Sequence, residues 1–162
     1  MDVRDEFVPP EEFATVLNRV PQVCVEVVLA GERADAGRVL LAHRTNEPAK
    51  GEWFWPGGRL YKGEQLEVAA RRVAREELGV EVTVEGRVGV YGHFWDTSRI
   101  DGVDARHTVN VVFRVARVDP DAAIELDDQH DDYRFVAGDE EGLHEYVREY
   151  LVDMGLRERA SE

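Results

Sequence analysis

The residues best suited to chemistry lie between positions 56 and 80, where a Pro-Gly-Gly loop is followed by regularly spaced acids. Arg72 and Glu76 are four residues apart, which places them on one face of a helix, and Glu77 follows directly. Carboxylate oxygens beside a backbone carbonyl suit a hard cation such as Mg²⁺, which also binds diphosphate oxygens. Taken alone, such i,i+4 pairs are also typical of a solvated helix. Together with the glycine loop they indicate metal-assisted chemistry on a phosphate compound.

A helix over residues 63–78 must carry these acids. Its apolar face comes from Leu66, Ala69, Ala70, Val73 and Leu78. Gly79 follows this face directly, and glycine is the residue that most often ends a helix. The spacing therefore predicts a loop, then a helix, then a second loop, with the acids along the exposed side.

The rest of the sequence predicts strands interleaved with two further helices. Strands are expected at 22–30, 38–42, 80–84, 87–94, 108–118 and 133–136, from their β-branched content and the turn residues between them. A short helix should follow Pro9-Pro10, and an amphipathic helix should cover 140–154. This pattern is typical of one α/β domain over residues 1–162, with a mixed sheet covered on both sides.

Composition limits the partners. The chain has 162 residues and a net charge of −14, which argues against nucleic acid or an anionic membrane as the main partner. No apolar run is long enough for a membrane span or a signal peptide, so a cytoplasmic location is expected. The lone Cys24 is expected to be a small core residue. Many acids and only two lysines, Lys50 and Lys62, also suggest a halophilic protein.

The segment Gly58–Val80 resembles the Nudix box, in which a glycine, several glutamates and an arginine recur at fixed spacing. The resemblance implies a Nudix-type α/β/α sandwich with a mixed sheet and a loop-helix-loop catalytic motif. One fixed position differs, because Val73 stands where the box has a glutamate directly after the arginine. A valine can neither bind metal nor activate water. A general base must therefore come from elsewhere, which points away from ordinary phosphoanhydride cleavage.

His130 is the best candidate for that base. It lies in an acidic loop, and an ordinary imidazole, with a pKa near ~6.5, can accept a proton at neutral pH. A solvated surface histidine is the simpler alternative at this position.

Longer segments resemble one branch of this superfamily, the GDP-mannose mannosyl hydrolases, which also lack the glutamate after the box arginine. The matching segments are Glu12–Val16, Arg44–Arg59 and Gln129–Arg134, with a looser match from Gly92 to His107. The resemblance implies Mg²⁺-dependent hydrolysis of a GDP-hexose such as GDP-mannose. Water attacks C1 of the sugar in that reaction, and GDP and free hexose are the products. Mn²⁺ is an alternative metal.

Carried onto this sequence, the resemblance assigns roles residue by residue. The backbone carbonyl of Gly57 would bind the metal together with Glu77 and Gln129, and His130 would deprotonate the attacking water. Glu76 is an acid that this branch often lacks, so it is a further candidate ligand and leaves the metal count open.

The remaining assignments concern the nucleotide sugar. Arg59 and Arg72 would lie near the diphosphate as catalytic cations. The other implied substrate-binding residues are Phe7, Val8, Phe13, Glu26, Arg44 and His93. Glu26 stands where the family has a shorter acid that contacts the sugar, and Thr108 replaces a tyrosine that assists the leaving group. His93 could instead be a core histidine. A homodimer is expected from the resemblance alone.

Two other functions stay open. The first is a pyrophosphatase that cleaves the phosphoanhydride of ADP-ribose, another nucleoside diphosphate sugar or a nucleoside triphosphate. The second is a nucleotide-sugar sensor that has lost catalysis.

Overall fold

Two neighbouring parallel strands form the centre of the fold. The computed structural model describes residues 1–160, and in it β1 (Gln22–Leu29) runs parallel to β6 (Arg106–Arg117). The short β4 (Gly57–Arg59) pairs antiparallel with the other edge of β1, and β5 (Val82–Trp95) pairs antiparallel with β6. The resulting four-stranded sheet has the order β4-β1-β6-β5 and is mixed, as the sequence predicts.

A second, three-stranded sheet lies beside the first. Its central strand β2 (Val39–Arg44) pairs antiparallel with β3 (Trp53–Phe54) and with β7 (His130–Val136). A 3-10 turn at Arg33–Asp35 lies in the connection from β1 to β2. Because β7 begins at His130, the candidate base is the first residue of a strand and does not lie in a free loop.

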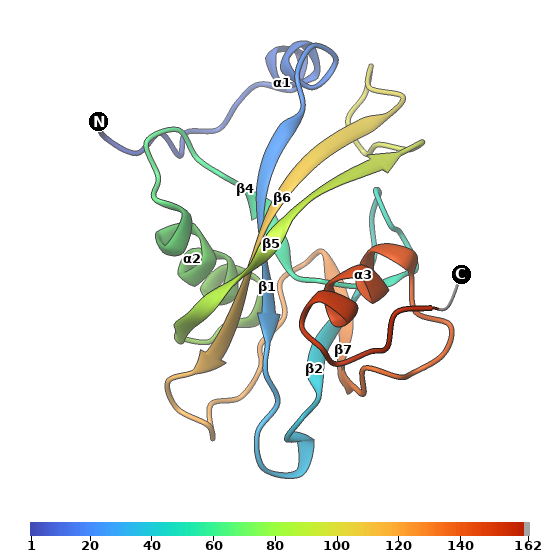
Figure 1. Ribbon diagram of the computed structural model, residues 1–162. Helices are drawn as coiled ribbons and strands as arrows, with labels where there is room; N and C mark the ends of the chain where they lie inside the picture. The colour runs from blue at the N-terminus through green and yellow to red at the C-terminus, as the bar shows by residue number, and fades with distance from the viewer. Residues whose placement is uncertain (161–162) are drawn as a thin grey trace.

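Helices α2 (Leu66–Leu78) and α3 (Glu145–Asp153) cover opposite sides of the strands (Figure 1). Alternate residues of β1 point to opposite faces. Val25 and Val27 pack with α2 residues such as Val73, whereas Val28 packs with α3 residues such as Tyr150. Both faces of the sheet are therefore buried. This burial explains why the second half of β1 is almost continuously apolar.

Helix α1 (Pro10–Leu17) packs elsewhere, near the start of β1 (Figure 1). Ala14 and Leu17 are buried against Val103, with Phe13 and Ile100 beside them. The N-terminal helix and the loop before β6 thus form a small apolar cluster of their own. No helix within residues 1–160 has the length and apolar character that crossing a membrane requires.

Several sequence-based boundaries were wrong. The two strands expected at 80–84 and 87–94 are one strand, β5, which keeps pairing with β6 through two bulges near Gly86 and Gly89. The short strands β3 and β4 were not among the strands expected from the sequence. Helix α3 begins at Glu145 rather than at residue 140, and His144 caps it by accepting a hydrogen bond from the Tyr146 amide.

Candidate active site

A pocket of about 480 Å³ opens between the β1 and β6 strands, α2, and the N-terminal segment. Its floor follows the alternation of the two parallel strands: Gln22, Cys24 and Glu26 come from β1, and Arg106, Thr108 and Asn110 come from β6. Cys24 therefore lies at the pocket floor, where burial raises the pKa of its thiol to about 12. A thiol in this state is neutral and acts as an apolar surface.

Buried carboxylates lie at the end of this floor nearest α2. Glu77 accepts a hydrogen bond of 2.8 Å from the Gly57 amide, and burial together with the negative charge of Asp127 raises its pKa to about 8. Gly57 lies opposite Glu26 in the strand pairing, and a Cβ there would come within 2.6 Å of Glu26 Cγ. The position therefore requires glycine, and the close approach brings Glu26 beside the loop.

The residues present fit a hard cation. A buried acid surrounded by other acids is costly unless positive charge compensates it, and from residues 1–160 the Glu77 carboxylate accepts a single hydrogen bond. Gly57 and Gln129 line the same pocket and carry neutral oxygen donors. Within residues 1–160 no three His, Cys, Asp or Glu side chains are grouped for a metal. A cation at Glu77 would therefore depend on these neutral oxygens.

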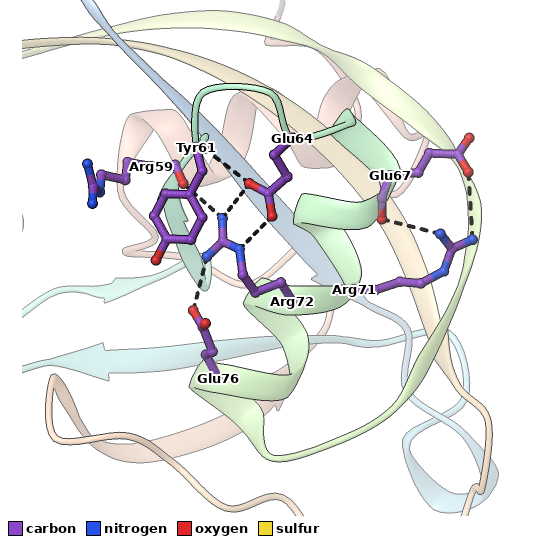
Figure 2. A network of polar contacts seen from close by, with 7 residues as sticks. All are labelled: Arg59, Tyr61, Glu64, Glu67, Arg71, Arg72 and Glu76. Carbon is purple, nitrogen blue, oxygen red and sulfur yellow. Dashed lines mark hydrogen bonds and ion pairs between the residues drawn. The ribbon is translucent and has the colours of Figure 1, made fainter. Parts of the chain in front are cut away.

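Arg72 joins α2 to the loop in front of it (Figure 2). Its guanidinium donates two hydrogen bonds to the Glu64 carboxylate, at 2.7 and 2.9 Å, and one of 3.0 Å to Glu76. A further bond of 2.9 Å reaches the Arg59 carbonyl, and the group lies 3.9 Å from the centre of the Tyr61 ring. Although Arg72 lines the pocket, its donors are already engaged, so its local role is to fix the loop that carries Arg59.

Arg59 keeps its guanidinium available at the pocket wall. It lies between two aromatic rings, 4.8 Å from the centre of Tyr61 and 5.9 Å from that of Phe13. Its one hydrogen bond, of 3.2 Å, goes to the Glu6 carbonyl in the N-terminal segment. Phe7 and Val8 follow in that segment and also line the pocket, with Phe7 83% exposed.

Glu26 is held from behind by α3. Tyr150 donates a hydrogen bond of 2.5 Å to Glu26 Oε2, and its oxygen lies 3.1 Å from Nε2 of His93. His93 is 1% exposed and stacks on Tyr146 with ring centres 3.9 Å apart. Burial lowers the pKa of His93 to about 4, so the ring is neutral at pH 7. His93 is therefore linked by hydrogen bonds through Tyr150 to Glu26. It also lies behind the pocket residues Phe54 and Trp95.

His130 forms a buried pair with Asp127. Its Nδ1 lies 2.7 Å from Asp127 Oδ1, and its side chain is 0% exposed. Burial lowers the pKa of His130, although the hydrogen bond and charge of Asp127 oppose that effect. Nε2 is buried and has no hydrogen-bond partner within residues 1–160. His130 is therefore not a solvated surface histidine, and Asp127, itself mostly buried, orients the ring.

Eleven of the thirteen predicted site residues line this one pocket. They are Phe7, Val8, Phe13, Glu26, Arg44, Gly57, Arg59, Arg72, Glu76, Glu77 and Gln129. His93 and His130 lie just behind its wall. Arg44 lies at the centre, where the charges of Glu77, Glu26 and Asp127 act on it. Segments that are distant in sequence thus meet at a cavity with acids and arginines side by side.

Comparison with known proteins decides the family. A family model for the NUDIX domain matches residues 20–152. The chain belongs to the NUDIX family. Its α/β fold is therefore a Nudix fold, and α2 with its flanking loops is the Nudix helix.

Two of the proteins to which the chain is similar illustrate the range of its relatives. It is 44% identical over 144 residues to the low-salt glycan biosynthesis protein Agl8 of Haloferax volcanii, which covers 89% of this chain and 88% of that protein. It is 32% identical over 93 residues to the ADP-ribose pyrophosphatase of Methanocaldococcus jannaschii, covering 57% of this chain and 49% of that protein.

Solved structures show the same fold. A MutT Nudix hydrolase from Burkholderia pseudomallei matches with a TM-score of 0.63 and 26% identity, over 83% of this chain and 98% of that one. The NUDIX domain of NrtR from Shewanella oneidensis, solved with ADP ribose, matches with a TM-score of 0.55 and 21% identity, over 72% of this chain and 73% of that one. Hydrolase activity is the property of the family, and Nudix hydrolases generally use divalent metal ions.

Sequence reasoning missed three residues that shape this Nudix site. Tyr150 holds Glu26, Asp127 orients His130, and Tyr61 stacks on the two arginines. Only the alternation of polar residues along β1, from Gln22 to Glu26, signalled that this strand forms the floor of a pocket. Tyr150 lies 124 residues from Glu26, so no local pattern could reveal their contact.

Proposed function

We propose that this Nudix hydrolase cleaves a GDP-hexose such as GDP-mannose, releasing GDP and free hexose by attack of water at C1 of the sugar. The observation that carries the proposal is Val73, which is 1% exposed and packs in the core at the position of the usual box glutamate. The Nudix helix therefore lacks that acid as a general base. The Asp127–His130 pair supplies a base from the segment beside the end of this helix, where the Asp127 amide donates a hydrogen bond to the Glu77 carbonyl.

In the proposed reaction, His130 Nε2 takes a proton from water while the water oxygen attacks C1. Asp127 accepts the Nδ1 hydrogen, which leaves the Nε2 lone pair free to act. The bond from C1 to the diphosphate oxygen breaks, and GDP leaves with both bonding electrons. Because Nε2 is buried, the segment Asp127–Gln129 must open enough to admit the water.

The departing diphosphate carries negative charge that must be neutralised. Mg²⁺, or Mn²⁺ in its place, would be held by Glu77, Gln129 and the Gly57 carbonyl and would supply that neutralisation. Glu76 is the candidate for a further ligand, although it already accepts a bond from Arg72. Arg59, with most of its donors free, would act beside the metal, and Glu26 would bind hydroxyl groups of the sugar.

The names of the relatives bear on the substrate in two different ways. The name of the Agl8 relative includes glycan biosynthesis, a process that uses activated sugars, and the alignment spans nearly all of both chains. The names of the other relatives point to ADP-ribose pyrophosphatase and 8-oxo-dGTP diphosphatase chemistry, which would cleave a phosphoanhydride instead. The homodimer and the cytoplasmic location stay predictions.

The test is to incubate the protein with GDP-mannose and Mg²⁺ in ¹⁸O-water and to identify the products. The proposal expects GDP plus mannose, with the label in the sugar. Glu77→Gln should abolish turnover, whereas Glu81→Gln, which removes an exposed acid just beyond α2, should not.

Other products would overturn the proposal. GMP plus mannose 1-phosphate with the label in phosphate would make the protein a pyrophosphatase. Binding of the nucleotide sugar without any product would make it a sensor.

A further inference from the structure

Arg106 has the features of a ligand-binding arginine. It is the first residue of β6, lines the pocket, and donates a hydrogen bond to the side chain of Gln22 on β1. Its Nε is buried and has no hydrogen-bond partner within residues 1–160. Burial lowers the pKa of Arg106, and the neighbouring cations Arg99 and Arg44 lower it further. Arg106 as a whole is half-buried, but a buried Nε–H without an acceptor is costly unless a ligand supplies one.

The position of Arg106 separates it from the proposed metal site. Gly57 pairs with Glu26, whereas Arg106 bonds to Gln22, four residues earlier on the same strand. Four residues of a β-strand span roughly 13 Å, at about 3.3 Å per residue. That is further than the two phosphates of one diphosphate extend. A diphosphate bound at Glu77 therefore leaves Arg106 to contact the far end of the nucleotide sugar.

The far end of the pocket suits a flat base. Phe13 and Ile100 line it and pack in the same small apolar cluster, so they offer surfaces for the faces of a ring. The sugar, in turn, belongs at the Glu26 end, because Glu26 lies beside Gly57. A nucleotide sugar that bridges both ends must place its nucleobase next to Arg106 and Gln22.

We propose that Arg106, held by Gln22, selects the nucleobase by donating to its acceptor edge, and that the preferred base is a 6-oxopurine. Guanine presents two adjacent acceptors, O6 and N7, which match the paired donors of an arginine. Adenine presents an amino group in place of O6, so a donor would face a donor. The proposal rests on the proposed function only in taking this pocket as the nucleotide-sugar site.

The experiment measures binding of GDP, IDP and ADP by calorimetry in buffer with EDTA, so that no turnover occurs. The wild-type protein should bind GDP and IDP more tightly than ADP by about 5- to 150-fold, because both carry O6 and N7. Arg106→Met should remove most of that preference and leave ADP binding unchanged. Arg106→Lys keeps the charge but loses the planar pair of donors, so the preference should also fall.

Arg114→Met is the matched control. Arg114 lies on the same strand but pairs with Glu85 outside the pocket, so this variant removes an equal charge without touching the site. Its affinities for all three nucleotides should equal those of the wild type. Thermal melting of each variant establishes that it is folded before binding is compared.

Two outcomes would overturn the inference. Equal affinity of the wild type for GDP and ADP would show that the base is not selected. An equal loss for GDP, IDP and ADP in Arg106→Met would show that Arg106 holds a phosphate. Neither result concerns the bond that is cleaved, so failure of the proposed reaction would be seen separately, in the products formed from GDP-mannose.

Discussion

Two histidine–aspartate pairs lie on neighbouring strands and differ mainly in burial. His130 and Asp127 form the buried pair behind the pocket, with the histidine side chain 0% exposed. His43 and Asp131 form a similar pair, 2.6 Å apart, but the His43 side chain is 30% exposed. Residue type and the distance between the paired nitrogen and oxygen atoms do not distinguish them. Location beside the pocket makes the first pair the candidate base.

This contrast gives a test of His130. We expect His130→Ala to lower kcat by about 10²- to 10⁴-fold, the usual contribution of a general base, with little change in nucleotide affinity. If His130→Ala is poorly folded, His130→Gln takes its place. Its amide still offers a donor to Asp127, and we expect the same loss of kcat. His43→Ala should retain full turnover. A His130 variant with unchanged kcat would remove this residue from the mechanism.

His93 predicts a pH dependence of stability. Its pKa is about 4 in the folded protein against an ordinary value of 6.5. Above pH 6.5 His93 is neutral in both the folded and the unfolded state, so its contribution to the free energy of unfolding is fully present. As the pH falls from 6.5 towards 4, only the unfolded state gains a proton, so stability is lost. Between pH 7.5 and pH 5 the loss from this group is about 2 kcal/mol.

The measurement is urea unfolding at the two pH values. His93→Gln should lose less stability than the wild type over this interval, by about the same 2 kcal/mol. Comparing the change with pH, rather than absolute stabilities, removes the cost of the substitution itself. Equal pH dependence in both proteins would contradict the prediction.

At the level of elements, the Nudix helix and the loop before it are joined by one ion pair. Glu64 is 2% exposed in its side chain and accepts two hydrogen bonds from Arg72 and one from the Tyr61 amide (Figure 2). The neighbouring Glu67–Arg71 pair is exposed, with a separation of 3.7 Å. The same two residue types thus form a buried ion pair in one place and a solvated ion pair in the other.

We therefore expect Glu64→Ala to lower the free energy of unfolding by about 3 kcal/mol, because Arg72 loses a buried partner. Turnover should fall as well, since the loop that carries Arg59 is no longer fixed. Glu67→Ala should change stability by less than about 0.5 kcal/mol. Chemical denaturation of the wild type and the two variants checks both values. Equal stabilities would show that the Glu64–Arg72 ion pair does not stabilise the fold.

At the level of the whole molecule, charge is distributed unevenly. The chain carries a net charge of −14, yet five arginines line its main pocket: Arg44, Arg59, Arg72, Arg99 and Arg106. Five acids line the same pocket: Glu26, Glu47, Glu76, Glu77 and Asp127. Positive and negative side chains are therefore balanced in the pocket, so an anionic ligand meets less repulsion there than over the rest of a protein that is negative overall. The same net charge makes the acidic surface repel itself, and dissolved salt screens that repulsion.

We expect the melting temperature to rise steadily as NaCl is increased from about 0.05 M, where the Debye length exceeds 10 Å, to about 1 M, where it is near 3 Å. KCl should act equally, since screening depends on ionic strength rather than on the ion. A protein that is fully stable at low salt would refute the expected halophilic character.

The sequence alone determined the Nudix helix, the mixed sheet and most of the pocket residues. The helix and the strands follow from local periodicity and fixed spacing, whereas most of the pocket residues were implied by the resemblance to the GDP-mannose mannosyl hydrolases. It could not determine that Asp127 is buried against His130, that Tyr150 holds Glu26, or that Arg106 meets Gln22. The contact of Asp127 with His130 depends on burial. The other two contacts join distant segments, which only the packing of α3, β1 and β6 brings together. The spacing thus identified the family, and tertiary structure decided which groups are buried, paired and brought to the pocket.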